Sequence, residues 1–309
     1  MFKPQIYAKA AMNKEQIAVK KSIGCSGIEI QLLNELKKPD GWHTLEEVFN
    51  IEDFYSEPVS VVHAPLLTGV GDMTIEQMAD LNDCSLFYEV CRLANIFGAA
   101  HDKMITVVVH SETFLGFIGG IGETLNNIEK MIDQSLNTYE YVKIGIENVS
   151  PLRDIGKGGN LHLSNNFRFD NVELVQRIRK DLMTGRVGTV LDTCHAMLAD
   201  KYISCLYKEV GDRAPEDLSM SRFFYENQPV CFLIHLAGMK GSGYGKGRHG
   251  TPFRMSNPAD VTTCNSILSL YDRYEYSCPI TLEVEETDFS ICDGYRDTKE
   301  IVDKYFEGE

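Results

Sequence analysis

The sequence contains no apolar run that could cross a membrane. No stretch of its 309 residues approaches the roughly eighteen consecutive apolar residues that a transmembrane helix requires. The N-terminal segment, MFKPQIYAKAAMNKEQ, also lacks the apolar region and the cleavage site of a secretory signal. These absences argue against a membrane partner and lead us to expect a cytoplasmic protein.

Closely spaced cysteine pairs are absent as well. Nine cysteines are scattered along the chain, and no C-x-x-C motif brings two of them together. An odd number without close spacing is typical of reduced thiols in a protein core rather than of a disulfide framework. We expect Cys194, although it lies between Asp192 and His195 in sequence, to be such a core thiol that points away from them.

Positive charge is scarce, which bears on the class of partner. The chain has 30 basic and 45 acidic residues and a formal net charge of −15, which disfavours general binding to nucleic acid. One local exception is the segment Gly238–Ala259, which holds four cationic residues and no acid. We expect this segment to bind an anionic or polyhydroxylated substrate through Lys240, Arg248 and His249. A flexible lid is the alternative, and the same local charge leaves nucleic acid open as a partner.

Strand and helix patterns alternate from one end of the chain to the other. Strict alternation favours a parallel sheet with right-handed crossovers. Eight such units without a linker predict one domain, residues 1–309, with the α/β fold of a single (β/α)8 TIM barrel. No G-x-G-x-x-G motif follows the first strand, which disfavours an open dinucleotide-binding sheet. The expected strands are Gln5–Ala8, Gly27–Leu32, Val59–His63, Met104–His110, Val142–Glu147, Val187–Asp192, Val230–His235 and Ile280–Glu285. Among the expected helices are Thr74–Phe97, Pro215–Glu226 and Asp297–Phe306, and Thr44 with Glu47 fits a capping box at the start of another.

Six of these apolar strands end in an ionisable residue. A buried parallel strand has no need of a charged tip, so six tips at the same end of a barrel indicate a shared polar site that binds a cation. Three carboxylates and one imidazole form an oxygen-rich ligand set that suits Mn²⁺, Mg²⁺ or Co²⁺, with Zn²⁺ also open. The four candidate ligands are Glu147, Asp192, His235 and Glu283; His63 and His110 are candidates for a second ion bridged by Glu147.

These motifs together resemble the xylose isomerase-like barrel superfamily, which includes sugar isomerases, ketose 3-epimerases and endonuclease IV. The residues that carry the resemblance are HAP at His63, IEN at Glu147, LDTCHA at Asp192 and HL at His235. The resemblance spans nearly the whole chain, from SGIEIQL to TLEVEE. It implies a (β/α)8 barrel with a divalent metal ion bound by Glu147, Asp192, His235 and Glu283.

Two branches of this superfamily imply different reactions. In the epimerase branch, which the GIEI motif resembles, Glu147 and Glu283 would act as two carboxylate acid/bases through an enediolate, and His195 would orient substrate hydroxyls. His63, His110 and His195 resemble the endonuclease IV branch, a metal-dependent phosphodiesterase. That branch has an aspartate where this chain has Gly247 and a tyrosine where it has Leu66. We therefore expect an isomerase or epimerase of a sugar or sugar phosphate, with the phosphodiesterase as first alternative and a non-catalytic metal-binding barrel as second.

Overall fold

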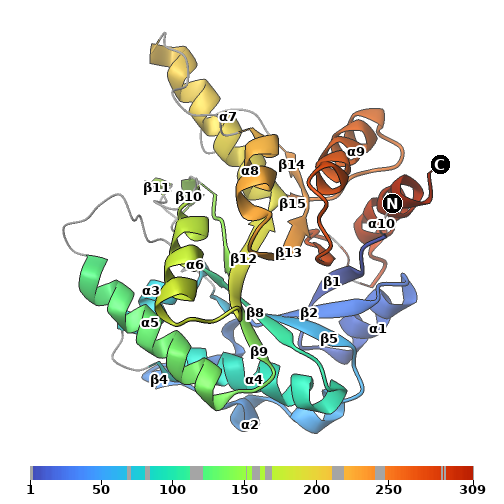
Figure 1. Cartoon of the computed structure of the whole chain (residues 1–309). Helices are drawn as coiled ribbons and strands as arrows, with labels where there is room; N and C mark the ends of the chain where they lie inside the picture. The colour runs from blue at the N-terminus through green and yellow to red at the C-terminus, as the bar shows by residue number, and fades with distance from the viewer. Residues whose placement is uncertain are drawn as a thin grey trace.

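The computed structural model shows that eight parallel strands close into one barrel (Figure 1). Every neighbouring pair in the ring is parallel, including the pair that joins the last strand to the first. The predicted (β/α)8 TIM-barrel fold is therefore confirmed. In order around the ring, the strands are β1 (Ile6–Ala11), β2 (Gly27–Gln31), β5 (Val59–His63), β8 (Ile105–His110), β9 (Val142–Glu147), β12 (Val187–Asp192), β13 (Cys231–Leu236) and β16 (Ile280–Leu282).

The structure describes most of the chain, with gaps in some of the loops. The described residues are 3–67, 71–80, 84–111, 121–150, 152–154, 161–163, 169–210, 219–240, 248–286, 288 and 290–308.

Helices surround the barrel and connect its strands (Figure 1). Local capping contacts define several helix starts: the Asn13 side chain accepts from two backbone N–H groups of α1, and the expected Thr44–Glu47 capping box is present in α2. No helix in the described ranges combines the length and the apolar character needed to cross a bilayer. The helices are α1 (Lys14–Ser22), α2 (Leu45–Val48), α3 (Ile75–Asp80), α4 (Ser85–His101), α5 (Ile121–Thr138), α6 (Asp170–Asp181), α7 (Thr193–Val210), α8 (Met220–Asn227), α9 (Pro258–Arg273) and α10 (Asp293–Glu307), with 3₁₀ turns η1 (Asn34–Leu36) and η2 (Ile51–Phe54).

Three helices differ from their predicted bounds. The helix expected over Thr74–Phe97 is two helices, α3 and α4, and residues 81–83 between them lie outside the described part. The start of the helix expected from Pro215 also lies outside it. The last helix, α10, begins four residues earlier than predicted, at Asp293. A tertiary contact explains this, because a carboxylate oxygen of Glu286 accepts from the Tyr295 backbone N–H at 2.8 Å and satisfies a donor of the first turn.

Short antiparallel hairpins lie in loops that follow four of the barrel strands. The hairpin after β13 belongs to the segment expected to bind substrate, and in it Lys240 pairs with Arg248. The hairpins are β3 (Lys37–Lys38) with β4 (Gly41–Trp42), β6 (Leu66–Leu67) with β7 (Gly71–Asp72), β10 (Leu152–Asp154) with β11 (Leu161–Leu163), and β14 (Gly238–Lys240) with β15 (Arg248–Thr251).

The barrel interior is a small apolar layer separate from the larger cores beneath the helices. Its glycines leave room for larger neighbours: a Cβ on Gly145 would lie 2.6 Å from a methyl carbon of Val190. Because side chains alternate along a strand, residues two positions further on also point into the barrel. The interior cluster consists of Tyr7, Val61, Val108, Val190 and Leu233.

Candidate metal centre

All eight barrel strands place an ionisable residue above this apolar layer. Five of these residues lie two positions after a member of the interior cluster, and the other three lie two positions after Gly27, Gly145 and Thr281. The alternation of a strand therefore directs one polar side chain from each strand toward the barrel axis. These residues are Lys9, Glu29, His63, His110, Glu147, Asp192, His235 and Glu283.

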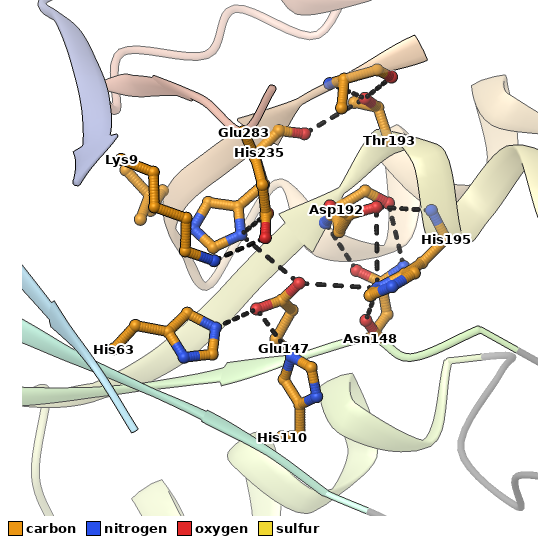
Figure 2. A network of polar contacts seen from close by, with 12 residues as sticks. Lys9, His63, His110, Glu147, Asn148, Asp192, Thr193, His195, His235 and Glu283 are labelled. Carbon is orange, nitrogen blue, oxygen red and sulfur yellow. Dashed lines mark hydrogen bonds and ion pairs between the residues drawn. The ribbon is translucent and has the colours of Figure 1, made fainter. Parts of the chain in front are cut away.

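The four predicted principal ligands come together at one point (Figure 2). Ligand atoms of Glu147, Asp192, His235 and Glu283 all lie within 4.8 Å of one another. The Nδ1 atom of His235 is 2.7 Å from Oε2 of Glu283 and 3.4 Å from Oε1 of Glu147. None of these three buried atoms has a hydrogen-bond partner of acceptable geometry among the described residues. Buried polar atoms that converge without hydrogen bonds fit a bound cation.

The imidazole of His235 is oriented by Glu29. Its Nε2–H donates to Oε2 of Glu29 at 3.0 Å, and both side chains are fully buried. Because this bond uses Nε2, Nδ1 is the atom that faces the other candidate ligands. A carboxylate behind a metal-binding histidine is the usual way in which proteins fix its tautomer.

A second candidate group adjoins the first and shares Glu147. Ligand atoms of His63, His110 and Glu147 also lie within 4.8 Å of one another. The Nδ1–H of His63 donates to the backbone oxygen of Ala64 at 2.9 Å, so its Nε2 faces Oε2 of Glu147 at 3.3 Å. The Nε2 atom of His110 lies 3.2 Å from the same oxygen. The structure thus places both histidines where the sequence predicted a second ion.

Asp192 is held in place by its neighbours at the start of α7. Oδ1 of Asp192 accepts from the backbone N–H of His195, and the Asn148 side chain bonds to both backbone groups of Asp192 at 2.7 and 3.0 Å. His195 donates from Nδ1 to the backbone oxygen of Asn148 at 2.9 Å. His195, predicted to act on the substrate, therefore belongs to the cluster. Asn148 was not predicted as a site residue, although it belongs to the IEN motif.

The predicted substrate-binding residues have different outcomes. His249 reaches the cluster, since its Nε2 lies 3.1 Å from Oδ2 of Asp192 and its ring centroid lies 4.6 Å from that of His195. The backbones of Lys240 and Arg248 lie in the β14–β15 hairpin, but their side chains are outside the described part of the chain. The predicted substrate contacts of both therefore remain predictions.

Cys194 lies closer to the site than expected. Its side chain is buried, as predicted, but its sulfur lies within 4.8 Å of ligand atoms of Asp192 and His249. The expectation that it points away was wrong. The reason is local: α7 begins at Thr193, so the chain turns by about 100° per residue here instead of alternating as in a strand.

The cluster is strongly coupled electrostatically. Burial opposes the charge of Glu283, but the nearby Lys9 and His235 outweigh it and hold the pKa of this carboxyl well below its usual range. Burial likewise opposes a charged His235, but Glu29, Glu147 and Glu283 raise its pKa well above the ordinary value. Burial is also outweighed at His249, where Asp192 raises the pKa to about 9. Protons on His235 and His249 therefore balance part of the carboxylate charge.

This balance predicts that metal binding releases a proton. At pH 7 a raised pKa keeps His235 doubly protonated, and a cation can bind Nδ1 only after that atom loses its proton. Calorimetric titration with Mn²⁺ in two buffers of different ionisation enthalpy is expected to show release of about one proton per ion. The His101→Gln variant, which changes a histidine outside the cluster, is expected to release the same number. A buffer-independent heat would contradict the proposed role of Nδ1.

Two members of the ring, Lys9 and Glu29, were not predicted. Both lie within their strands rather than at the end, so the pattern of ionisable strand ends does not include them. Alternate residues of a strand point to the same face, so counting in steps of two from an inward-facing residue could have identified both.

A cavity of about 310 Å³ lies beside the cluster. Lys9, His249 and Glu283 line its polar side, whereas the fully buried Glu147 does not border it. Leu66, the residue found where endonuclease IV has a tyrosine, is 41% exposed and also lines the cavity. The remaining lining residues are Ala10, Ala11, Gln16, Gln31, Leu33, Val284, Glu285 and Tyr295.

Comparison with known proteins identifies the architecture. No protein-family model and no curated protein sequence matches the chain. A xylose isomerase domain protein from Planctomyces limnophilus superposes with a TM-score of 0.62 at 10% identity, with 100% of both chains covered. A D-tagatose 3-epimerase-like protein gives 0.57 at 16% identity over 98% of this chain and 97% of its own.

A third solved structure is a D-allulose 3-epimerase from Methylomonas sp. in complex with D-allulose. It gives a TM-score of 0.56 at 13% identity over 99% of this chain and 96% of its own. These similarities extend over nearly the whole length and agree with the closed parallel barrel. The predicted resemblance is confirmed at the level of architecture: the chain has the fold of the xylose isomerase-like TIM barrels.

Proposed function

We propose that this protein is a divalent-metal-dependent isomerase or epimerase that acts on a sugar or sugar phosphate. The observation that carries the proposal is the convergence of Glu147 Oε1, His235 Nδ1 and Glu283 Oε2. Among the described residues these buried atoms have no hydrogen-bond partner of acceptable geometry, and Glu283 borders a cavity of about 310 Å³. A pocket of this size, with convergent polar groups, is typical of small-molecule sites.

The donor set fits a hard divalent cation. Glu147, Asp192, His235 and Glu283 would hold Mn²⁺, Mg²⁺, Co²⁺ or Zn²⁺ through three carboxylates and one imidazole. When bound, the cation would act as a Lewis acid toward a carbonyl or hydroxyl oxygen of the substrate.

We propose that two carboxylates, Glu283 and Glu147, handle the proton. Glu283 borders the cavity, and its lowered pKa keeps it ionised at neutral pH, which is the state that a base needs in order to accept a proton. Glu147 approaches from β9. Two strands lie between β9 and β16 on one side of the ring, and four lie between them on the other. We propose Glu147 as the second acid/base of an enediolate mechanism, with His195 orienting a hydroxyl group.

The cavity has groups that match a polyhydroxylated substrate. Gln31 uses its side-chain nitrogen to donate to the backbone oxygens of Leu32 and Ala64, which leaves its oxygen as an acceptor. Gln16 accepts from the Ala11 backbone N–H at 3.0 Å, which leaves its nitrogen as a donor. The acceptor would receive a hydrogen bond from one hydroxyl group, and the donor would give a hydrogen bond to another. This arrangement supports a sugar as the substrate.

The solved structures add support of the same kind. Structures with the same fold include ketose 3-epimerases, and one of them holds D-allulose. We also propose that this protein works in the cytoplasm, because all eight cysteines whose side chains are described are free thiols.

A metal-dependent phosphodiesterase is the second candidate, because His63 and His110 converge on Glu147. Such an enzyme would use two or more ions to act on a phosphodiester. Against this candidate, the net charge is −15, and Arg254, one of the four cations of the basic segment, is paired with Asp297 at 3.1 Å.

Metal content and hydrogen exchange test these candidates together. We expect purified protein loaded with Mn²⁺ to hold one ion and to exchange the carbon-bound hydrogen next to the carbonyl of a ketose such as D-allulose or D-tagatose in D₂O, detected by NMR. A duplex with an abasic site is expected to remain uncut. Two or three ions with efficient cleavage would favour the phosphodiesterase. Metal binding without either reaction would favour a non-catalytic barrel.

A further inference from the structure

Lys9 is a cationic residue inside a site that is built for a cation. It projects from β1 into the ring of ionisable residues, and its side chain is only 13% exposed (Figure 2). Its Nζ lies 2.5 Å from Oε1 of Glu283 and 3.5 Å from Oε1 of Glu29. The ammonium group is thus next to one proposed ligand of the ion and to the residue that orients His235.

A lysine in this position is unfavourable for metal binding alone. Its positive charge repels a divalent ion at the neighbouring ligands and neutralises part of the charge of Glu283. Burial opposes the charge of Lys9, but Glu283, Glu29 and Glu147 outweigh it and raise its pKa, so the group stays ionised. A site that only held a metal ion would bind it more tightly with an apolar residue here. The weaker metal binding that the lysine causes indicates that its charge has a second function.

The cavity indicates what that purpose is. Lys9 lines the cavity together with Glu283, and among the described residues the only hydrogen bond of its ammonium group goes to Glu283. An ammonium group has three N–H donors, so two remain beyond the bond to this carboxylate. The bond also engages Oε1 of Glu283, whereas Oε2 is the atom that faces His235. Lys9 therefore directs one carboxylate oxygen toward the proposed ion and offers donors to the cavity.

We propose that Lys9 is a substrate-binding residue whose ammonium group donates a hydrogen bond to the substrate oxygen that becomes negatively charged during isomerisation. The inference rests on the proposed function and specifies it further, because it assigns the binding of a polyhydroxylated ketone or aldehyde to a fixed cation on β1. A preorganised donor of this kind stabilises charge where it develops.

The test depends on two effects of opposite sign. Lys9→Met removes the repulsion, so it is expected to bind Mn²⁺ at least about ten-fold more tightly in calorimetric titration. The same variant, saturated with Mn²⁺, is expected to bind D-allulose about ten- to a hundred-fold more weakly, because a charge-assisted hydrogen bond is lost. Lys143→Met is the control, since Lys143 is also a partly buried lysine on a barrel strand but stacks on Phe232 outside the site. The control is expected to change neither affinity.

A second variant shows whether weak sugar binding results from misfolding or from the loss of the Lys9 contact. Lys9→Met removes the ammonium group that lies 3.5 Å from the buried carboxylate of Glu29, whereas Lys9→Met with Glu29→Gln restores the local charge balance. The double variant is expected to melt near the wild-type temperature and still to bind D-allulose weakly. Wild-type affinity for D-allulose in either variant, or weaker Mn²⁺ binding by Lys9→Met, would overturn the role of Lys9 alone. A wild-type protein that binds Mn²⁺ but neither D-allulose nor D-tagatose would overturn the proposed function and this inference together.

Discussion

Glu147→Gln is expected to weaken Mn²⁺ binding by more than about a hundred-fold and to abolish the proposed hydrogen exchange. Losing a residue that merely orients a ligand costs ten- to a hundred-fold in affinity, and Glu147 is itself a proposed ligand that both candidate groups share. Its carboxylate is fully buried and lies within 3.5 Å of four histidines. The amide of glutamine keeps the shape but removes the charge. Calorimetry and metal analysis after gel filtration would measure the loss.

Two further variants make this prediction specific. Glu283→Gln is expected to lose Mn²⁺ from the four-ligand group and to leave the His63–His110 pair with its carboxylate. Glu285→Gln is the control, because Glu285 lines the same cavity but belongs to neither candidate ligand group. Wild-type metal content in both Glu147→Gln and Glu283→Gln would show that the ion, if bound, uses other residues.

The convergence of the strand-end residues could be predicted from the sequence, because an ionisable residue is unusual at the end of a buried apolar strand. In VSVVH, VKIGIE and VGTVLD the apolar run specifies a strand buried on both faces, and only a shared polar site accounts for the ionisable residue that follows. Strict strand–helix alternation then fixes the common end of the sheet at which these residues meet. The clearest signal in the sequence is therefore a residue whose polarity differs from that of the strand to which it belongs.

Lys9 was not predictable by that reasoning because it lies in the middle of the strand IYAKAA and not at its end. A lysine with alanine on both sides looks like a solvent-facing residue of an edge strand, whereas barrel closure places it inside. Glu29 lies in the middle of the GIEI motif, and its bond to His235 joins residues 206 positions apart. Contacts of this range depend on which strands lie opposite in the ring, and local patterns do not contain that information.

Glu29→Gln is the variant that tests this long-range contact. His235 donates its Nε2–H to the Glu29 carboxylate, which fixes the ring and increases the basicity of Nδ1. We expect Glu29→Gln to weaken Mn²⁺ binding by about ten- to a hundred-fold, because glutamine keeps an acceptor but not the charge. Glu57→Gln is the control, since Glu57 pairs with Lys21 at 2.9 Å and precedes β5 at the opposite end of the barrel.

The double variant Lys9→Met with Glu29→Gln distinguishes two explanations of the pair formed by Lys9 and Glu29. If Glu29 served only to neutralise Lys9, its loss would leave an unbalanced cation beside Glu283, and Lys9→Met would fully restore Mn²⁺ affinity in the double variant. If Glu29 also orients His235, the double variant is expected to bind Mn²⁺ more weakly than Lys9→Met alone. We expect the second result, because the bond between Nε2 and Glu29 is 3.0 Å whereas Lys9 stands 3.5 Å from the same carboxylate. Equal affinities of the double variant and Lys9→Met would remove Glu29 from the proposed metal site.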